Sequence, residues 1–207
     1  MTATPPEASF EAPLADGYHV FPRGKVLNVV TWLEMRAPPA APVAPPLPVV
    51  HHRTPDPRWY RPLFLAIGAP WLWTMHMELD DDGLAAALAD PALTVLAGRD
   101  GGRDVALAVL ERHRGGDVEI LSFGLVPEAT GRGLGPRLMA SALAHAFASD
   151  PPRVWLHTCT DDHPAALGFY RRCGFVPYRT GIEVLDDPRL TGLLPRDAAP
   201  RVPLLEP

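Results

Sequence analysis

Hydrophobic and polar positions alternate along the chain in a pattern that predicts a mixed α/β fold. Residues 25–35 are rich in β-branched side chains and predict a strand, and residues 56–68 form an apolar, helical stretch that Pro62 interrupts. Residues 80–90 predict a short helix with an acidic first turn, which suits the positive end of the helix dipole, and Pro91 ends it.

The centre of the chain predicts an antiparallel meander. Three apolar segments are separated by the glycine-containing sequences "RDGGR" and "HRGG", which is typical of strands joined by short turns. The segments are 93–98, 104–112 and 117–126.

The second half of the chain predicts helices that alternate with strands. A long helix is expected over 133–148, a strand over 153–159, a helix from about 162 to Gly174, and a last strand over 175–185. Gly174 suits the left-handed position just past a helix end. Together with the meander, these elements predict a mixed sheet with antiparallel and parallel pairs.

Proline-rich flanks suggest the domain organisation. We expect an N-terminal extension over 1–24, a domain over 25–185, and a tail over 186–207 that lies along the surface or is partly disordered. Prolines within 36–48 remove backbone donors and fix φ, so this piece is expected to be an extended connector inside the domain. The alternative for it is a ligand for a proline-reading partner domain.

Composition narrows the class of protein. The chain has 207 residues, 47% of them hydrophobic, which is enough for one domain with a sizeable core. A net charge of −5 argues against a nucleic-acid partner. Cys159 and Cys173 are the only cysteines, so a reducing compartment is expected. We find neither a signal-peptide pattern nor an apolar run long enough for a membrane span, and therefore expect a cytoplasmic protein without a membrane partner.

A glycine-rich stretch, "GLVPEATGRGLGPRLM" at 124–139, joins a predicted strand to a predicted helix. A P-loop would need Lys and Ser or Thr after its last glycine, and a dinucleotide fingerprint would need its third glycine one place later. The interpretation that is left is a turn at a helix N-terminus whose backbone N–H groups converge on a diphosphate. The alternative is a merely flexible turn. Arg132 and Arg137 would offset the anion's charge, or be solvated surface residues.

A second stretch, 155–178, follows at a suitable distance and resembles the second signature of the GNAT superfamily of N-acetyltransferases. Ala166, Tyr170, Gly174 and Phe175 fall on the positions of that signature. Residues 130–135 likewise resemble the acyl-CoA loop of the family, Gln/Arg-x-x-Gly-x-Gly/Ala.

The resemblance covers about residues 25–185 and implies the GNAT fold, with helices on both faces of the sheet and two strands that splay apart. The chain departs from the family pattern at Thr130, where Gln or Arg is usual, and at His163, where Asn is frequent. Pro136 also removes one amide that a phosphate could use.

The resemblance further implies acetyl-CoA as co-substrate and no metal. The pantetheine arm would lie between the strands 117–126 and 153–159, and the diphosphate would lie on the glycine turn. The residues expected to bind it are Leu125, Val126, Thr130, Gly131, Arg132, Gly133, Leu134, Gly135, His163 and Tyr170.

Three residues are candidates for proton transfer. Glu119 is the only carboxylate well inside its strand and stands where histone-type members of the family carry a basic Glu, so it would help to deprotonate an amine. Glu111 is the reserve base, and a solvated Glu at a strand end is the alternative for Glu119. Tyr170 would protonate the departing thiolate, with a core tyrosine as the alternative.

The acceptor side is expected near "GAPWLWTMHM", where Trp71 and Trp73 either contact the amine substrate or pack in the core. His157, Cys159 and His163 allow two other interpretations, a metal site or a Cys-His nucleophilic site. We expect Cys159 to be a small buried residue instead.

These observations predict an N-acetyltransferase that moves acetyl from acetyl-CoA directly to a primary amine in a ternary complex. The acceptor would be a small molecule or a peptide that the sequence does not identify. For the oligomeric state, a homodimer is one option. The alternative function is a GNAT-like domain that binds CoA as a sensor or interaction module without transferring acetyl.

Overall fold

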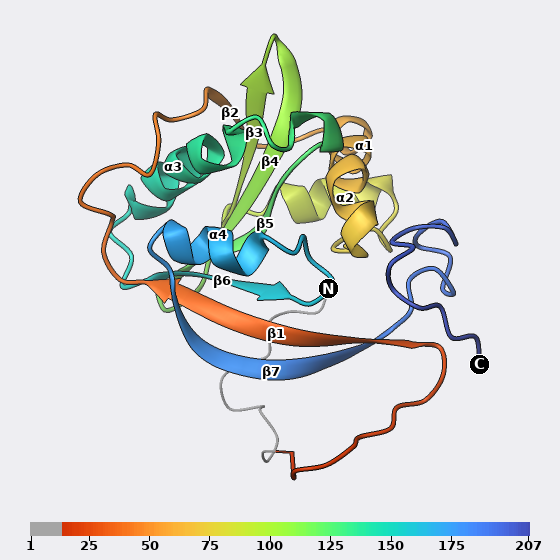
Figure 1. Ribbon diagram of the computed structural model, residues 1–207. Helices are drawn as coiled ribbons and strands as arrows, with labels where there is room; N and C mark the ends of the chain where they lie inside the picture. The colour runs from red at the N-terminus through yellow and green to blue at the C-terminus, as the bar shows by residue number, and fades with distance from the viewer. Residues whose placement is uncertain (1–13) are drawn as a thin grey trace.

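A seven-stranded sheet forms the centre of the protein in the computed structural model, which describes residues 14–207 (Figure 1). The order of the strands across the sheet is β2-β3-β4-β5-β6-β1-β7, and all neighbours are antiparallel except β5 and β6. The strands are β1 Lys25–Met35, β2 Val49–His52, β3 Leu93–Asp100, β4 Arg103–Arg112, β5 Val118–Leu125, β6 Val154–Cys159 and β7 Val176–Asp186.

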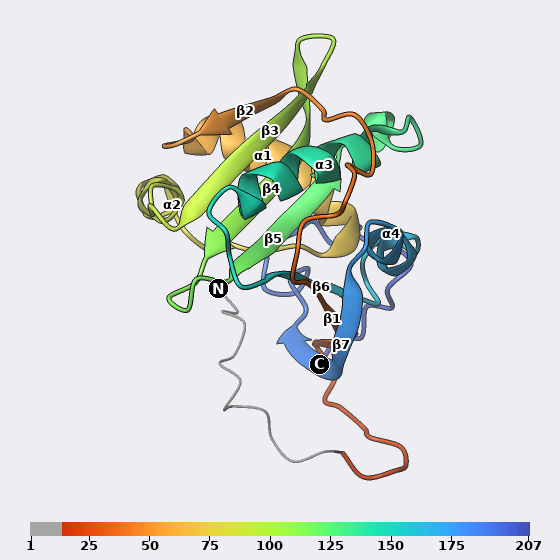
Figure 2. The ribbon, with the colours of Figure 1, turned by 90° about the vertical axis from the view of Figure 1, so that its left-hand side faces the viewer.

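Helices cover both faces of the sheet, as predicted (Figure 2). They are α1 Pro57–Gly68, α2 Asp81–Leu88, α3 Leu134–Phe147 and α4 Ala166–Arg172, with 3₁₀ turns η2 Ala69–Trp71 and η3 Pro127–Ala129. One buried cluster lies between the sheet and the pair α3 and α4, and a second lies between the sheet and the pair α1 and α2. No helix within residues 14–207 is long and apolar enough to cross a membrane.

Helix α1 differs from the sequence prediction at Pro62, which lies inside a continuous helix instead of interrupting it. The missing N–H affects only the bond to the fourth preceding residue, Arg58, which belongs to the first turn. Asp56 caps this end by accepting a hydrogen bond from the backbone N–H of Arg58 at 2.8 Å. The buried face of α1, which includes Tyr60 and Phe64, anchors the helix to the sheet.

The predicted meander is present as β3, β4 and β5, and it contains a β-bulge. Val109 pairs with Ser122, whereas Leu110 pairs with Ile120, so Leu121 is an extra residue in β5. Such a bulge bends a strand and increases its local twist. The bend matters because it lies where β5 separates from β6.

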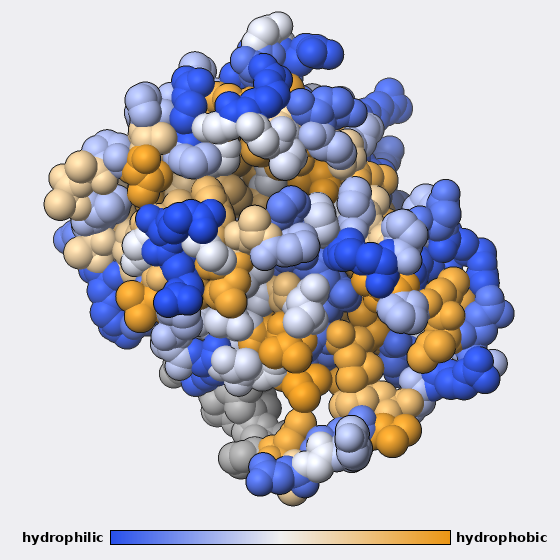
Figure 3. Space-filling model, viewed as in Figure 1, coloured by the Kyte–Doolittle hydropathy of each residue, from blue (hydrophilic) through white to orange (hydrophobic). Residues whose placement is uncertain are grey.

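Strand β1 lies between β6 and β7, a position that periodicity does not reveal. Strand β7 pairs with β1 alone, so the first strand of the chain joins the last strand to the rest of the sheet. Apolar side chains gather over this ribbon (Figure 3), including the cross-strand pairs Leu27–Val184 and Val29–Ile182, which are all exposed.

The proline-rich connector 36–48 has no helix or strand, as predicted, but it is attached to α3. The backbone N–H of Leu47 donates to Arg137 O at 3.0 Å, and Ser141 Oγ donates to Leu47 O at 2.7 Å. The connector then enters β2, a short edge strand that the sequence analysis did not predict.

The C-terminal segment 187–207 folds back beside the end of α1 (Figure 1). Arg189 and Asp187 form an ion pair within it, with exposed fractions of 3% and 1%. Two guanidinium nitrogens reach the two carboxylate oxygens of Asp187 at 2.9 and 2.6 Å, and the same side chain donates to the carbonyl oxygens of Ala198 and Val202. The segment is therefore organised around a buried charge pair, although most of its residues after Arg189 are exposed or half-buried.

Candidate functional site

The candidate site is built around the separation of two parallel strands. Strands β5 and β6 pair only at Val118–Val154 and Glu119–Trp155, and beyond these pairs they diverge. The edge of β5 that faces β6 therefore has no ladder partner from Ile120 onward. Unpaired strand edges offer N–H and C=O groups to an extended ligand.

Backbone direction decides which groups of β5 face this opening. The N–H of Val126 donates to Val105 O on β4 at 2.9 Å. Because successive residues of a strand direct their backbone groups to opposite neighbours, the N–H and C=O of Leu125 face the open side. Of the two residues predicted to pair with the pantetheine arm, Leu125 is thus oriented for it, whereas the amide of Val126 is already engaged.

The glycine turn follows directly and begins α3. Gly131 and Gly133 adopt φ values of +77° and +73°, a left-handed conformation that favours glycine, and Gly133 is the N-cap without any side-chain cap. A Cβ added at either residue would meet no atom within 4 Å. The first N–H groups of the helix have no intrahelical acceptor. The turn therefore presents backbone donors and positive dipole to open space, which fits a diphosphate.

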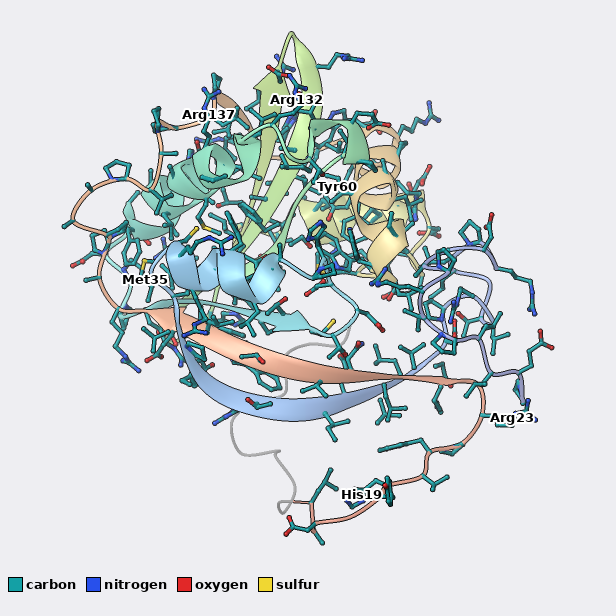
Figure 4. All side chains as sticks on the ribbon, in the orientation of Figure 1. His19, Arg23, Met35, Tyr60, Arg132 and Arg137 are labelled. Atoms are coloured by element: carbon teal, nitrogen blue, oxygen red, sulfur yellow. The ribbon has the colours of Figure 1, made fainter. Side chains whose placement is uncertain are left out.

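Two arginines near the turn are held by neighbouring groups (Figure 4). Arg132 pairs with Asp100, at the end of β3, at 2.6 Å, and Arg137 donates to the carbonyl oxygens of Pro45 and Pro46 at 3.3 and 3.5 Å. Both guanidinium groups are engaged by protein groups in exposed contacts, which leaves the backbone N–H groups of the turn as the candidate donors to an anion.

Tyr170 lies on the face of the sheet that α3 and α4 cover. Its ring packs edge-on against Phe123, Phe169 and Phe175, with centroid distances of 6.1, 5.4 and 6.3 Å, and 9% of the residue is exposed. Burial, reinforced by the charge of Asp162, raises the pKa of the phenol above its ordinary value. The Tyr170 phenol is therefore protonated at neutral pH.

Glu119 lies on the opposite face and is 0% exposed. Its Oε2 is 2.9 Å from His113 Nε2, and its Oε1 is 3.6 Å from His157 Nδ1. The first contact is a hydrogen bond, and the second is an ion-pair contact longer than a hydrogen bond. Trp155 stacks on His113 with a centroid distance of 5.5 Å and pairs with Glu119 across the strands. The predicted base is thus enclosed by two imidazoles.

The three groups shift each other's protonation. Burial would raise the pKa of Glu119, but the two imidazoles outweigh it and lower that pKa below the ordinary value. The hydrogen bond to Glu119 raises the pKa of His113. Burial would lower the pKa of His157, but the contact with Glu119 raises it. The carboxylate therefore stays ionised and makes both imidazoles more basic.

Glu111, the reserve base, is directly opposite Glu119 on β4. Burial raises its pKa. Within residues 14–207, Glu111, His113 and Glu119 are the one set of metal-type donors that approach each other closely, so the alternative metal site built on His157, Cys159 and His163 does not form there. Burial raises the pKa of the Cys159 thiol to about 12, which also removes it as a nucleophile at neutral pH.

Sequence reasoning did not identify Asp162 as a central residue. Its Oδ1 accepts from Trp73 Nε1 at 2.9 Å, and its Oδ2 accepts from Thr158 Oγ1 and the Cys159 N–H at 2.7 and 2.9 Å. The indole of Trp73 also packs over Gly124 of β5. Trp73 thus connects the two diverging strands. In the sequence, the only sign of a role for Trp73 was its position in the segment expected on the acceptor side.

Trp71 and His163 form a second contact on this side, with a centroid distance of 5.1 Å. The guanidinium of Arg201 stacks on Trp71 at 4.5 Å and donates to the carbonyl oxygens of Pro70 and Asp161. His163 Nδ1 also accepts from the backbone N–H of Ala165 at the start of α4. The C-terminal segment therefore fastens η2 to the loop after β6.

Replacing Asp162 by asparagine should lower the free energy of unfolding by about 1–3 kcal/mol, because the amide NH₂ would face donors that the carboxylate now satisfies. Urea unfolding measures this loss. Asp161→Asn is the matched control: the Oδ2 of Asp161 is buried without a partner among the described residues, and burial raises its pKa. Removing the charge of Asp161 should therefore change the free energy of unfolding little. Equal losses of unfolding free energy in the two variants would contradict the role of Asp162.

Comparison with known proteins gives one family match. Residues 57–175 match the model of the acetyltransferase (GNAT) family. Mycothiol acetyltransferase of Clavibacter michiganensis is 37% identical over 95 residues, which cover 46% of this chain and 30% of that protein. Mycothiol acetyltransferase of a Nocardioides species is 47% identical over 55 residues, 27% of this chain and 18% of that protein. The matched regions thus span less than a third of these relatives.

Solved structures share the fold at low sequence identity. A functionally unknown conserved protein from Staphylococcus epidermidis aligns with a TM-score of 0.57 and 15% identity, covering 79% of this chain and 63% of that chain. A putative GNAT acetyltransferase from Novosphingobium aromaticivorans aligns with a TM-score of 0.54 and 20% identity, covering 80% and 68%.

Proposed function

Because the chain belongs to the GNAT acetyltransferase family, we propose that it transfers an acetyl group from acetyl-CoA directly to a primary amine. Its family and its fold support an acetyltransferase. The direct transfer, the amine acceptor and the roles of individual residues are our inference from the site.

One observation carries the proposal: the opening between β5 and β6 has the glycine turn at its wide end, and the candidate proton-transfer residues Tyr170 and Glu119 lie on its two faces. The turn would hold the diphosphate of acetyl-CoA, and the unpaired edge of β5 near Leu125 would pair with the pantetheine arm. When bound, acetyl-CoA supplies the activated acetyl group as a thioester. The chain contributes binding, orientation and proton transfer.

Amine activation requires a proton acceptor. An alkylamine with a pKa of about 10.4 is about three units too basic to be neutral at pH 7, which costs roughly 4 kcal/mol. Glu119 is a weak match as a direct base because its pKa is lowered and its carboxylate is enclosed. We assign it to stabilise positive charge on the imidazoles beside it. Glu111, Trp71 and Trp73 would border the acceptor.

Replacing Tyr170 by phenylalanine should lower turnover by about 10²- to 10⁴-fold, the usual contribution of a positioned general acid. The phenol donates the proton that the departing thiolate needs, and phenylalanine keeps the ring among its aromatic neighbours. Affinity for acetyl-CoA should change no more than a few-fold. Steady-state kinetics, calorimetry and thermal unfolding on the same variant measure all three quantities.

Tyr60→Phe is the control for this experiment. Tyr60 is 0% exposed, and its hydroxyl has no hydrogen-bond partner within the described part of the chain. Losing that hydroxyl should leave turnover unchanged and should not lower stability. A Tyr170→Phe variant with normal turnover and a lowered melting temperature would show that Tyr170 is a core residue instead of the acid.

The proposed function itself is tested by thiol release from acetyl-CoA with a panel of amines. The panel contains an alkylamine, an arylalkylamine, a polyamine, a lysine peptide and the acceptor substrate of mycothiol acetyltransferases. We expect amine-dependent thiol release with at least one class. Tight CoA binding without release for any amine would favour the alternative, a CoA-binding domain that has lost transfer.

A further inference from the structure

We propose that His157 is the residue that removes the proton from the acceptor amine, with Glu119 behind it as the positioning residue. This inference rests on the proposed function and names a catalytic group for it. The carboxylate of Glu119 approaches Nδ1 of His157 at 3.6 Å. That contact leaves Nε2, the other ring nitrogen, as the atom that receives the proton.

Accessibility separates His157 from Glu119. The Glu119 side chain is 1% exposed, whereas that of His157 is 38% exposed. A substrate amine can therefore approach the imidazole but not the carboxylate. Glu119 is ionised and buried, and such a group needs positive partners to offset the cost of its burial. His157 and His113 are those partners.

Position along the strands separates His157 from His113. His157 is two residues beyond Trp155, the last residue of β6 that pairs with β5, so it lies on the part of β6 that borders the opening. His113 follows β4, next to the paired end of β5 and β6, and its Nε2 is occupied by Glu119 at 2.9 Å. Of the two histidines that contact Glu119, only His157 therefore lies on the part of the sheet that borders the opening.

The faces of the sheet are also consistent with the two proton transfers. Residues 157, 155 and 119 share the face opposite α3 and α4, because Trp155 lies outside the cluster that contains Tyr170. The amine would give its proton to His157 on one face, and the sulfur would receive a proton from Tyr170 on the other. The two transfers then do not compete for the same space.

Charged groups from several elements surround His157. Glu119 on β5, Glu183 on β7 and Asp162 after β6 raise its pKa, against the opposing effect of burial, and Trp32 on β1 packs at a centroid distance of 6.2 Å. His113 adds a competing positive charge at Glu119. The acidic surroundings stabilise the imidazolium that forms when the amine loses its proton.

The proposed step balances in protons and bonds. The ammonium proton of the acceptor moves to Nε2 of His157, and the neutral amine nitrogen forms the C–N bond to the acetyl carbon. The C–S bond breaks, and the departing sulfur takes the proton of the Tyr170 hydroxyl. A second proton leaves the amide nitrogen to solvent, from which Tyr170 is reprotonated, and His157 returns its proton to solvent.

The test compares His157→Gln with His113→Gln, using acetyl-CoA and the most active amine of the panel. Wild-type kcat/KM should rise with pH through the pKa of His157, because the neutral imidazole is the active form. His157→Gln should lower kcat by about 10²- to 10⁴-fold near pH 7 and remove this rise, with acetyl-CoA affinity unchanged. His113→Gln should retain the rise of kcat/KM with pH. A kcat within a few-fold of wild type in His157→Gln, with the rise retained, would overturn the inference.

Glu119→Gln provides a second readout that does not depend on the stability of the histidine variants. Loss of the carboxylate should lower the pKa of His157 and move the rise in kcat/KM to lower pH. NMR titration of the imidazole resonances measures that pKa directly, and an unchanged His157 pKa would contradict the pairing.

Activity should persist after chelation of divalent metals, whereas loss on chelation would overturn the inference in favour of a metal bound beside Glu119.

Inactivity of the wild-type protein toward every amine would refute the proposed function itself, and the NMR titration would still test the Glu119–His157 pair. An active wild-type protein with an unaffected His157→Gln variant would refute the inference alone.

Discussion

Replacing Gly133 by aspartate should weaken CoA binding by at least about 100-fold, which corresponds to about 2.8 kcal/mol. The carboxylate would stand beside the backbone amides that we propose to hold the diphosphate, so it repels the phosphates and occupies their space. Isothermal titration calorimetry with CoA measures the loss.

Fold disruption is not expected to explain this effect. A Cβ at Gly133 meets no atom within 4 Å, and asparagine and aspartate tolerate the left-handed conformation better than other residues do. Gly133→Asn is the matched control, because it has the same shape as aspartate without the charge. It should bind CoA clearly better than Gly133→Asp. Unchanged affinity in a folded Gly133→Asp protein would show that the turn does not bind the diphosphate.

Replacing Arg189 by methionine should lower the free energy of unfolding by about 3–5 kcal/mol, because it leaves the Asp187 carboxylate buried without its partner. The carbonyl oxygens of Ala198 and Val202 would also lose a donor. Chemical denaturation followed by tryptophan fluorescence reports the change, because Trp71 is held by the same C-terminal segment.

Lys25→Met is the control for this charge pair. Lys25 contacts Asp186 at 2.6 Å, but the carboxylate of that pair is 69% exposed. Lys25→Met should therefore lower the free energy of unfolding by less than about 1 kcal/mol. A loss for Arg189→Met as small as that for Lys25→Met would contradict the structural role of the buried pair.

The Asp187–Arg189 pair also gives stability a pH dependence. Burial alone would raise the pKa of Asp187, but the hydrogen bonds from Arg189 lower it below the ordinary 3.8. A lowered pKa in the folded state means that the pair stabilises the fold above about pH 3.8 and that this contribution is lost as the pH falls. Wild type should therefore lose more stability than Arg189→Met in that acidic window.

Local patterns were sufficient to predict most of the elements. The meander, α3 and the strand β6 follow from apolar periodicity, and the left-handed φ of +101° at Gly174 confirms its place after α4. The glycine turn was recognisable because its spacing and the following helix are local in sequence. These features depend on residues close together in the chain.

Long-range features were not predictable in the same way. The contact of Trp73 with Asp162 joins residues 89 positions apart, and no local signal marks either as a partner of the other. The position of β1 between β6 and β7 depends on which edge its backbone pairs with, which periodicity does not encode. Glu119 could be selected as a candidate from its strand, but the two imidazoles that enclose it come from different elements.

The most direct test of the proposed function measures thiol release and N-acetylated product in the same reaction, with acetyl-CoA and the amine panel. Direct transfer predicts equal amounts of free CoA thiol and acetylated amine at every time point, and unmodified protein by intact-mass spectrometry. Thiol release without acetylated amine, or an acetylated protein formed before the product, would contradict direct transfer.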